Sequence, residues 1–408
     1  MTGFIDIEGS KTMTQNNNNK KVSKASTSNE YLTLDDSWIN KIWEWADKFE
    51  LLDSEVPRDK KALIAMKKLE ILEPDLDEQH SRDVYKMDYV PDELAFLTNL
   101  VEINISGIRS KHLPHSIGQL TNLTKLSISH SNLIALPDSI GQLSNLTELF
   151  IDESKLKELP ESINQLTNLN KLFISRCQLR CLPHNIGQLS NLTILDLMHC
   201  ELRELPVSIG QLHNLMKLFI SYCGLKHLPD SIGKLTNLIE LDLIHCELRY
   251  LPDSIGQLTN LNKLYVNHCP LKKLPDSIGQ SSNLTELFIS HCKLKQLPNS
   301  IGQLTNLIRL DVIHCELKHL PDSIGQLTKL IELNLINCEL RDLPDSISQL
   351  SNLTKVNLSN CKLGDLPDSF FQLTSLEWIN LNGNPFVNLS SKAIDHLRTI
   401  DIVHGWEK

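Results

Sequence analysis

Apolar residues recur along most of this chain with a period of 23 residues. A typical unit, NLTELFISHCKLKQLPNSIGQLT, begins at Asn283. In its Leu287-Phe288-Ile289 stretch, the two aliphatic side chains face one side and the residue between them faces the other, as in a strand. Pro298 then ends the extended stretch, and the segment after it predicts a short helical turn that Asp or Ser side chains could cap.

The prolines show how regular this pattern is. Thirteen of them succeed one another at intervals of 23 residues, from Pro91 to Pro367, without insertion or deletion. A unit of this size can bury its apolar face only against its neighbours, so the predicted strands stack into one parallel sheet. The sequence therefore predicts an α/β solenoid.

The skeleton L-x-x-L-x-I-x-x-C-x-L-x-x-L-P-x-S-I-G-Q-L-x-N resembles the leucine-rich repeat family in its 23-residue intracellular form. Scaffold proteins of the Ras-suppressor type, plant intracellular relatives and bacterial members are the most similar. The resemblance covers Pro91 to Pro385. It implies a curved parallel β-sheet on the concave face, short helical turns on the convex side, and a protein partner.

The flanking segments predict caps for the repeat domain, which spans residues 91–385 in about 13 units. Residues 1–30 are polar and low in complexity, which predicts a disordered leader. Residues 31–90 predict a helical N-terminal cap: apolar residues at helical spacing over 36–50, then a divergent first repeat over 66–72 and an insertion through Tyr89. Residues 386–408 predict a C-terminal cap with a helix over 390–398.

Charge and composition narrow the class of partner. The formal charge of −10 disfavours a nucleic-acid ligand. The sequence contains no run of ~18–20 apolar residues, the length that a membrane span needs, so we do not expect membrane insertion. The N-terminus does not resemble a secretory signal. All ten cysteines lie between Cys177 and Cys361 rather than in the flanks, which favours a reducing cytoplasm, or a host cytoplasm if the protein is an injected bacterial effector. The oligomeric state stays open.

Histidine precedes cysteine in five units, which raises the question of metal or thiol chemistry. Adjacent strand residues face opposite ways, so the two side chains of such a pair cannot bind the same metal ion or act together as a catalytic dyad. Ser131 and Ser154 hold the cysteine position in earlier units, and the resemblance implies that this side chain points inward and bonds to loop backbone. We expect structural cysteines, and free thiols. The pairs are His199-Cys200, His245-Cys246, His268-Cys269, His291-Cys292 and His314-Cys315.

The histidines themselves should point outward and form a row at the strand edge, with His245, His268, His291 and His314 on consecutive units. Zinc needs about four converging ligands, and a row spaced by ~5 Å offers two at a time. A metal-responsive or pH-responsive surface therefore stays an alternative to a solvated edge.

The residues between the two strand aliphatics should face the concave surface. Aromatic side chains repeat there, and exposed aromatic residues usually mark an interaction site. We predict that the aromatic residues anchor a protein partner and the aspartates set specificity, beside the histidine row. The predicted positions are Phe150, Phe173, Asp196, Phe219, Asp242, Tyr265, Phe288 and Asp311.

Charged residues also fall into rows. Glu and Lys or Arg mostly alternate at the position before the second skeletal leucine, as at Lys263 and Glu286, which predicts ion pairs across the sheet. Two rows off the strands, one basic and one acidic, could pair with each other or flank a ligand, although a solvated face is the simpler interpretation. The basic row is Lys157, Arg180, Arg203, Lys226, Arg249, Lys272, Lys295, Lys318 and Arg341; the acidic row is Asp230, Asp253, Asp276, Asp322, Asp345 and Asp368.

The chain carries no phosphate loop, glycine-rich nucleotide fingerprint, HExxH or GxSxG motif. The sequence therefore predicts a non-enzymatic protein-binding scaffold without a cofactor. The main rival is a bacterial effector that acts on a host signalling protein. An enzyme would need the N-terminal 90 residues or the histidine row to be active.

Overall fold

The computed structural model describes residues 36–72, 87–386, 389 and 391–405. Contacts divide the chain into a unit that ends at Ser37 and a unit from Trp38 to Lys408. The predicted disordered leader, and most of the predicted insertion before Tyr89, lie outside the described residues. The repeat array belongs wholly to the second unit.

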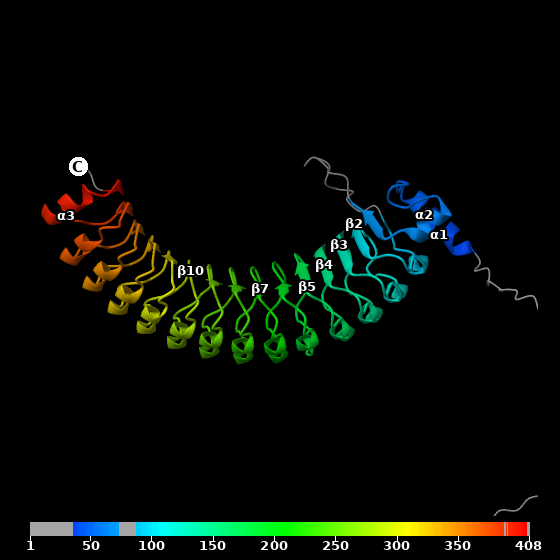
Figure 1. Cartoon of the computed structure of the whole chain (residues 1–408), viewed down its shortest axis with the longest axis horizontal. Coiled ribbons are helices and arrows are strands. Elements are labelled where there is room, and N and C mark those ends of the chain that lie inside the picture. Colours follow the sequence, from blue (N-terminus) through cyan, green and yellow to red (C-terminus); the bar gives the residue numbers. More distant parts are fainter. Residues whose placement is uncertain (1–35, 73–86, 387–388, 390, 406–408) are drawn as a thin grey trace, which may run out of the picture. The chain divides into compact units, whose positions relative to one another are not determined.

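The predicted parallel sheet is confirmed. Within the described residues, fifteen strands pair in chain order, every pairing is parallel, and strands line the concave side of the repeat array in Figure 1. The strands are β1 (Lys68–Ile71), β2 (Glu102–Ser106), β3 (Lys125–Ser131), β4 (Glu148–Ser154), β5 (Lys171–Ser175), β6 (Ile194–Asp196), β7 (Lys217–Phe219), β8 (Glu240–Asp242), β9 (Lys263–Tyr265), β10 (Glu286–Ser290), β11 (Arg309–Ile313), β12 (Glu332–Asn334), β13 (Lys355–Asn357), β14 (Trp378–Asn380) and β15 (Ile402–His404).

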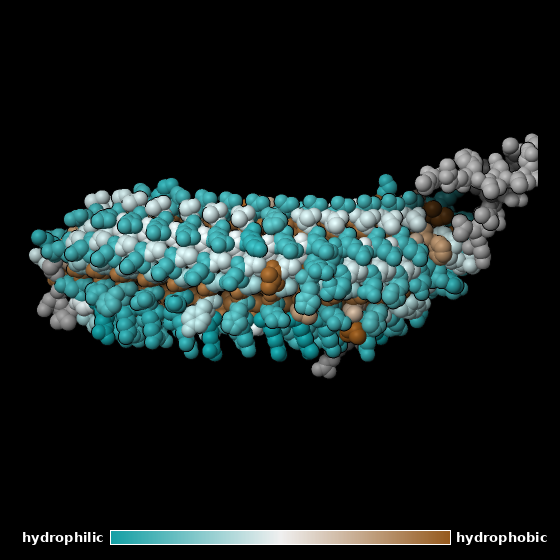
Figure 2. All heavy atoms as spheres, turned by 90° about the horizontal axis from the view of Figure 1, so that it is seen from below, coloured by the Kyte–Doolittle hydropathy of each residue, from teal (hydrophilic) through white to brown (hydrophobic). Residues whose placement is uncertain are grey.

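The short helical turns are 3-10 helices on the convex side (Figure 1). They are η1 (Asp92–Phe96), η2 (His115–Gln119), η3 (Asp138–Gln142), η4 (Glu161–Gln165), η5 (Ile186–Gln188), η6 (Val207–Gln211), η7 (Asp230–Lys234), η8 (Asp253–Gln257), η9 (Asp276–Gln280), η10 (Asn299–Gln303), η11 (Asp322–Gln326), η12 (Asp345–Gln349) and η13 (Asp368–Gln372). Figure 2 views this side, and polar side chains cover most of it.

The prediction that Asp or Ser caps these turns is wrong. Proline is the N-cap residue of each 3-10 helix except η5, and none has a side-chain cap bond. The proline carbonyl instead accepts from the backbone N–H three residues on, as Pro252 does from Ile255 at 3.0 Å.

The serine packs under the previous repeat instead. A Cβ added to Gly256 would lie 2.2 Å from the carbonyl oxygen of Ser277, so glycine is required for this contact between repeats. The Ser277 hydroxyl is buried and makes no hydrogen bond to the described protein atoms. Close backbone packing, rather than capping, explains the S-I-G motif.

Two helices and the first strand close the N-terminal end of the sheet. The helix predicted over 36–50 is α1 (Ser37–Lys48), and the divergent repeat contributes β1. Trp45 of α1 is buried and donates from its indole N–H to the Tyr89 carbonyl at 2.9 Å. A second helix, α2 (Lys60–Ala65), was not predicted.

At the other end, the predicted helix is α3 (Ser391–Leu397), with Ala393 and Leu397 buried. The chain then adds β15, which pairs with β14 and was not predicted. Among the described residues, no helix combines the length and apolar character that a membrane span requires.

Candidate protein-binding face

The sheet register places the predicted partner-binding residues in one row. Phe150 pairs with Phe173, and Phe173 with Asp196. The row continues through β7 to β11, where Phe288 pairs with Asp311. The aliphatic neighbours of these residues are fully buried, as Leu287 and Ile289 are, so the row occupies the open face of the sheet.

The aromatic members of the row form two stacked pairs and one separate ring. Phe150 and Phe173 stack with centroids 4.7 Å apart, and Tyr265 and Phe288 stack at 4.8 Å. Phe219 stands between Asp196 and Asp242. All five are half-buried, so each ring keeps part of its surface exposed to solvent.

Cations lie over three of these rings. The Arg309 guanidinium lies 5.1 Å from the Phe288 centroid, Lys125 Nζ lies 5.5 Å from Phe150, and Lys217 Nζ lies 6.0 Å from Phe219. Such contacts contribute roughly 0.5–1 kcal/mol at exposed sites. They also restrict the orientation of the rings on the sheet.

The three aspartates of the row bond to their own solenoid. Asp196 and Asp242 each accept from the backbone N–H two residues on, at 3.0 Å. Asp311 is buried and accepts from Arg309 at 2.9 Å and from the Asn334 amide at 2.6 Å. Burial raises the pKa of Asp196 above its ordinary value, and the nearby Asp152 and Asp242 charges add to that rise.

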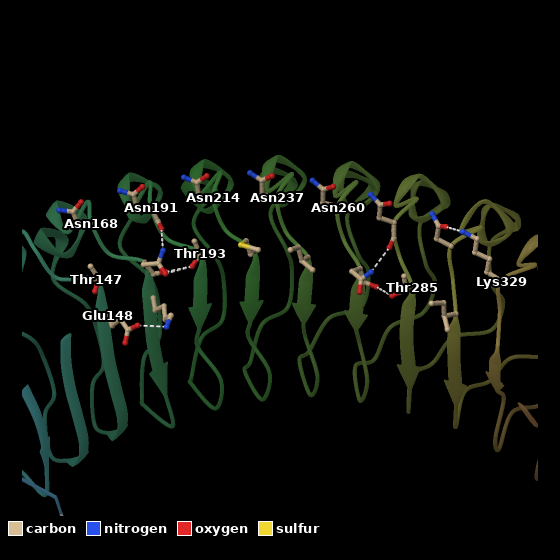
Figure 3. Close-up of a pocket in the computed structure, with 18 residues that line it drawn as sticks. Thr147, Glu148, Asn168, Asn191, Thr193, Asn214, Asn237, Asn260, Thr285 and Lys329 are labelled. Atoms are coloured by element: carbon tan, nitrogen blue, oxygen red, sulfur yellow. Dashed lines mark hydrogen bonds and ion pairs between the residues drawn. The ribbon is translucent and has the colours of Figure 1, made fainter. Parts of the chain in front are cut away.

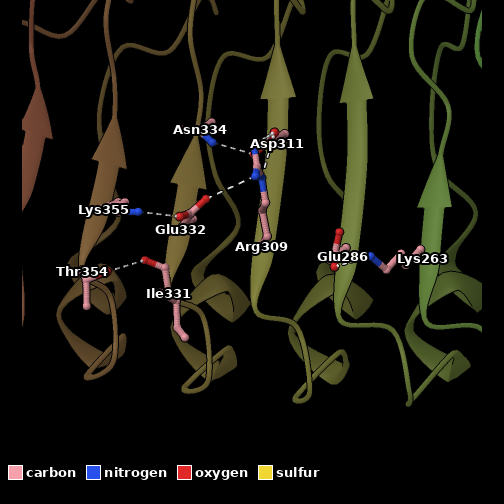
Figure 4. Close-up of polar contacts among 9 residues, drawn as sticks. All are labelled: Lys263, Glu286, Arg309, Asp311, Ile331, Glu332, Asn334, Thr354 and Lys355. Atoms are coloured by element: carbon pink, nitrogen blue, oxygen red, sulfur yellow. Dashed lines mark hydrogen bonds and ion pairs between the residues drawn. The ribbon is translucent and has the colours of Figure 1, made fainter.

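The predicted ion pairs across the sheet are present. Lys263 pairs with Glu286 at 2.8 Å, and Glu332 lies between Arg309 at 3.4 Å and Lys355 at 2.9 Å (Figure 4). Exposed pairs of this kind stabilise by only ~0.2–1 kcal/mol each. They order the side chains along one edge of the aromatic row.

A groove of about 1230 Å³ runs along the amino ends of the strands from β4 to β12. Asn191, Asn214 and Asn237 lie along one wall, and Thr193 and Thr285 lie along the other (Figure 3). Met216, Ile239 and Ile308 also line the groove. Asn191 donates from its amide to the Thr167 carbonyl at 2.8 Å, and nine further asparagines of the repeat make the equivalent bond. The asparagine of the repeated N-L-T motif therefore has a structural role.

Nine of the ten cysteines form an interior column, and Cys181 lies outside it. Cys292 is buried, and its thiol donates to the Val266 carbonyl at 3.1 Å. Its in-phase equivalents bond to carbonyls in the same way, and all ten cysteines are free thiols. Burial raises the pKa of Cys223 and of Cys269 to about 11, so these thiols stay protonated and unreactive at neutral pH.

The histidines lie beyond the strand ends, on the flank of the sheet. His245, for example, comes three residues after β8 ends at Asp242. Rings on consecutive repeats stack: His245 on His268 at 4.1 Å, His268 on His291 at 4.2 Å and His291 on His314 at 4.3 Å. In the described part of the chain, no group of three or more His, Cys, Asp or Glu side chains could hold a metal ion.

Sequence reasoning missed one member of this row. The Tyr222 ring lies between His199 at 4.2 Å and His245 at 4.4 Å, so the stack runs unbroken over six repeats. The signal was available, because Tyr222 holds the position before Cys223 that histidine holds elsewhere. We call these six stacked rings the ring ladder: His199, Tyr222, His245, His268, His291 and His314.

Stacked strand and 3-10 units with one open parallel sheet define a solenoid of short repeats. Models described as leucine-rich repeat match residues 121–179, 283–304, 332–386 and 351–404, and a model described as a leucine-rich repeat region matches 171–246. Among solved structures, a leucine-rich repeat protein from Leptospira interrogans is 31% identical with a TM-score of 0.73, over 85% of this chain and 86% of that one. The chain belongs to the leucine-rich repeat family.

Two other solved structures share the fold at lower identity. The functional domain of InlJ from Listeria monocytogenes, described as including a cysteine ladder, is 20% identical with a TM-score of 0.65, over 90% of this chain and 73% of that one. The plant peptide hormone receptor RGFR1, solved in complex with RGF2, is 24% identical with a TM-score of 0.59, over 78% of this chain and 61% of that one. No curated protein matches the chain significantly.

Proposed function

We propose that this protein is a non-enzymatic scaffold that binds a protein partner on the concave face of its sheet. The row of half-buried aromatic rings supports this proposal most, because solvent-exposed aromatic surface is costly unless a partner covers it. Leucine-rich repeat domains commonly bind proteins, and the RGFR1 structure is a receptor complex. Phe150, Phe173, Phe219, Tyr265 and Phe288 are the proposed anchors.

The aspartates have a different role in this proposal from the aromatic residues. Asp196 and Asp242 are only half-buried, so each can accept a further bond from a partner. Asp311 is buried and engaged by Arg309 and Asn334, so it acts by holding Arg309 over Phe288. Specificity would then come from Asp196 and Asp242 beside the Phe219 ring.

Affinity capture from the source cell tests the proposal. The double variant Phe219→Ala and Phe288→Ala should lose the partners that the wild type retains. Val207→Ala serves as a control, since Val207 is 74% exposed on the convex side, and it should retain them. Identical capture by all three proteins would exclude the concave face.

We further propose that the protein works in a reducing cytoplasm, and that its partner is a signalling protein of a host cell. The nine buried free thiols support the compartment, and the 31% identity with a Leptospira protein supports a bacterial effector. Fractionation of infected host cells tests this: the protein should be found in the host cytosol. Retention in the bacterium would contradict the effector role and leave the binding face untouched.

A further inference from the structure

The flank beyond the carboxyl ends of the strands carries a second row beside the ring ladder. The basic row predicted from the sequence runs from Lys157 to Arg341, and all nine side chains are exposed. Backbone hydrogen bonds join neighbouring members, as from Lys272 to Arg249 at 3.1 Å. Adjacent members are therefore about one strand spacing apart, ~4.8 Å, where like charges repel.

Few internal anions compensate this repulsion. Arg180, Lys226 and Lys295 reach Glu201, Glu247 and Glu316 at 3.2, 3.8 and 3.9 Å, and all six side chains are largely exposed. Exposed pairs at such distances contribute little. Among the described residues, no ion pair joins the basic row to the acidic row that the sequence suggested as its counterpart.

The positive charge is densest over four consecutive repeats. Three lysines here make no ion pair with any described residue: Lys272, Lys273 and Lys293. The cluster also includes Lys295 beside Lys293, and it ends at Arg249 on one side and Lys318 on the other. We call these six residues the basic strip. The four histidines from His245 to His314 belong to the same four repeats, four residues before the members of the basic row. A chain of net charge −10 thus concentrates six cations along one flank, against the two carboxylates of Glu247 and Glu316 in the same repeats.

We propose that the basic strip and the ring ladder together bind an acidic segment of a polypeptide, and that binding strengthens as the pH falls. Carboxylates on one face of a helix recur every ~5–6 Å, close to the ~4.8 Å spacing of the cations. A long nucleic acid would meet the repulsion of the whole acidic protein, whereas a short segment senses mainly the local charge. This surface is separate from the aromatic row, so either proposal can fail without the other.

The pH dependence arises from the groups around the imidazoles. His268 faces His245 and His291, while Tyr222 stacks on His245 and Asn337 contacts His314 at 3.0 Å. The charged residues next along these turns are Glu201, Glu247, Lys293 and Glu316, with Arg176 preceding His199 in the row. Burial, and then the neighbouring imidazoles, lowers the pKa of His268 and His291, so both gain their charge at a lower pH than an ordinary imidazole does.

A labelled peptide of ten glutamates, titrated into the full chain at low salt, tests the proposal. At pH 7.5, the variant Lys272→Gln, Lys293→Gln and Lys295→Gln should bind about tenfold more weakly than wild type, since three close charges are lost from an unscreened site. The control Lys61→Gln, Lys111→Gln and Lys234→Gln removes equal charge elsewhere and should bind within about twofold of wild type, because distant exposed charges are screened.

A second variant isolates the imidazoles. Asn337 and Asn360 adopt the same left-handed backbone as the ladder histidines, so His245→Asn, His268→Asn and His291→Asn should preserve the fold. Wild type should bind the peptide several-fold more tightly at pH 5.5 than at pH 7.5, and this variant should lose that gain while keeping its affinity at pH 7.5. Absence of binding, equal losses in both lysine variants, or an unchanged pH gain without the histidines would overturn the proposal. Equal affinity for a single-stranded oligonucleotide of matched charge would overturn the choice of an acidic polypeptide.

Discussion

At the scale of single residues, the position before each cysteine of the interior column, and before Ser131 and Ser154 in earlier units, has an unusual backbone. Residues there have φ between 47° and 59°, as at His130, Tyr222 and His268. Non-glycine residues rarely adopt this left-handed conformation, and β-branched ones avoid it most. The occupants are His, Asn, Glu, Arg and Tyr, without Val, Ile or Thr, which agrees with that preference.

His268 offers a direct test of this backbone requirement. His268→Val should lower the free energy of unfolding by about 1–3 kcal/mol, because a β-branched residue is strained at φ 56°. His268→Asn, which loses the same ring, should cost clearly less, and the difference isolates the backbone effect from lost stacking. Urea unfolding measures both, and equal losses would contradict the assignment of strain.

Thiol reactivity provides the second residue-scale prediction. Cys181 is exposed, whereas the nine in-phase cysteines are buried. Burial shields all nine from a reagent and raises the pKa of eight of them, to about 12 for Cys338. The exception is Cys315, whose pKa is lowered by a hydrogen bond with the Cys292 thiol, although its side chain is buried like the others. An alkylating reagent at pH 7.5 should therefore label one thiol in the folded protein and ten in denaturant. Labelling of Cys181→Ser in the folded state would contradict the interior column.

At the scale of elements, the contact between successive 3-10 helices depends on glycine. Gly256→Ala should destabilise the protein by about 1–3 kcal/mol, because the new Cβ would overlap the Ser277 carbonyl oxygen and force the two repeats apart. Gly224→Ala is the matched control, since its Cβ would lie 3.7 Å from its nearest neighbour. The stability of Gly224→Ala should equal or slightly exceed that of the wild type. Thermal unfolding of the two variants measures the difference, and equal melting temperatures would contradict the proposed overlap at Gly256.

The elements that the sequence predicted share one property: they lie in the uninterrupted 23-residue period. That period determined the strand register, so Phe150 and Phe288 could be placed on one row from the sequence alone. The elements and contacts that the sequence did not predict lie outside this period or depend on how closely two repeats approach each other. Helix α2 and strand β15 come after segments without a repeat, and the serine contact under Gly256 depends on backbone approach rather than on pattern.

The candidate site shows the same division. Position in the row was predictable from register alone. The roles of Asp196 and Asp311 could not be predicted from the sequence. Asp196 bonds to nearby backbone and Asp311 to a neighbouring arginine, and the sequence pattern does not distinguish such carboxylates from one that is free to bind a partner. Similarly, the sequence predicted that the histidines point outward from the solenoid. It did not predict the left-handed backbone at these positions or the stacking of their rings.

At the scale of the whole molecule, each repeat of Trp38–Lys408 contacts mainly its neighbours. Stability in such arrays is close to a sum of repeat and interface terms, so a local defect has a local effect. Trp45→Ala removes a fully buried ring and its bond to the Tyr89 carbonyl, which should cost about 3–5 kcal/mol. Hydrogen exchange should then accelerate in β1 to β3 and stay unchanged in β10 to β12. Uniform acceleration would show that the array unfolds as one cooperative unit.

We propose that the concave aromatic row binds a protein, and this binding can be measured. Once a partner has been captured, titration calorimetry with Phe150→Ala, Phe219→Ala and Phe288→Ala gives the most direct test. Buried aromatic anchors typically contribute about 2 kcal/mol or more, so at least one variant should bind about thirtyfold more weakly, while Val207→Ala on the convex side binds as wild type does. Affinities unchanged in all three concave variants would contradict the account.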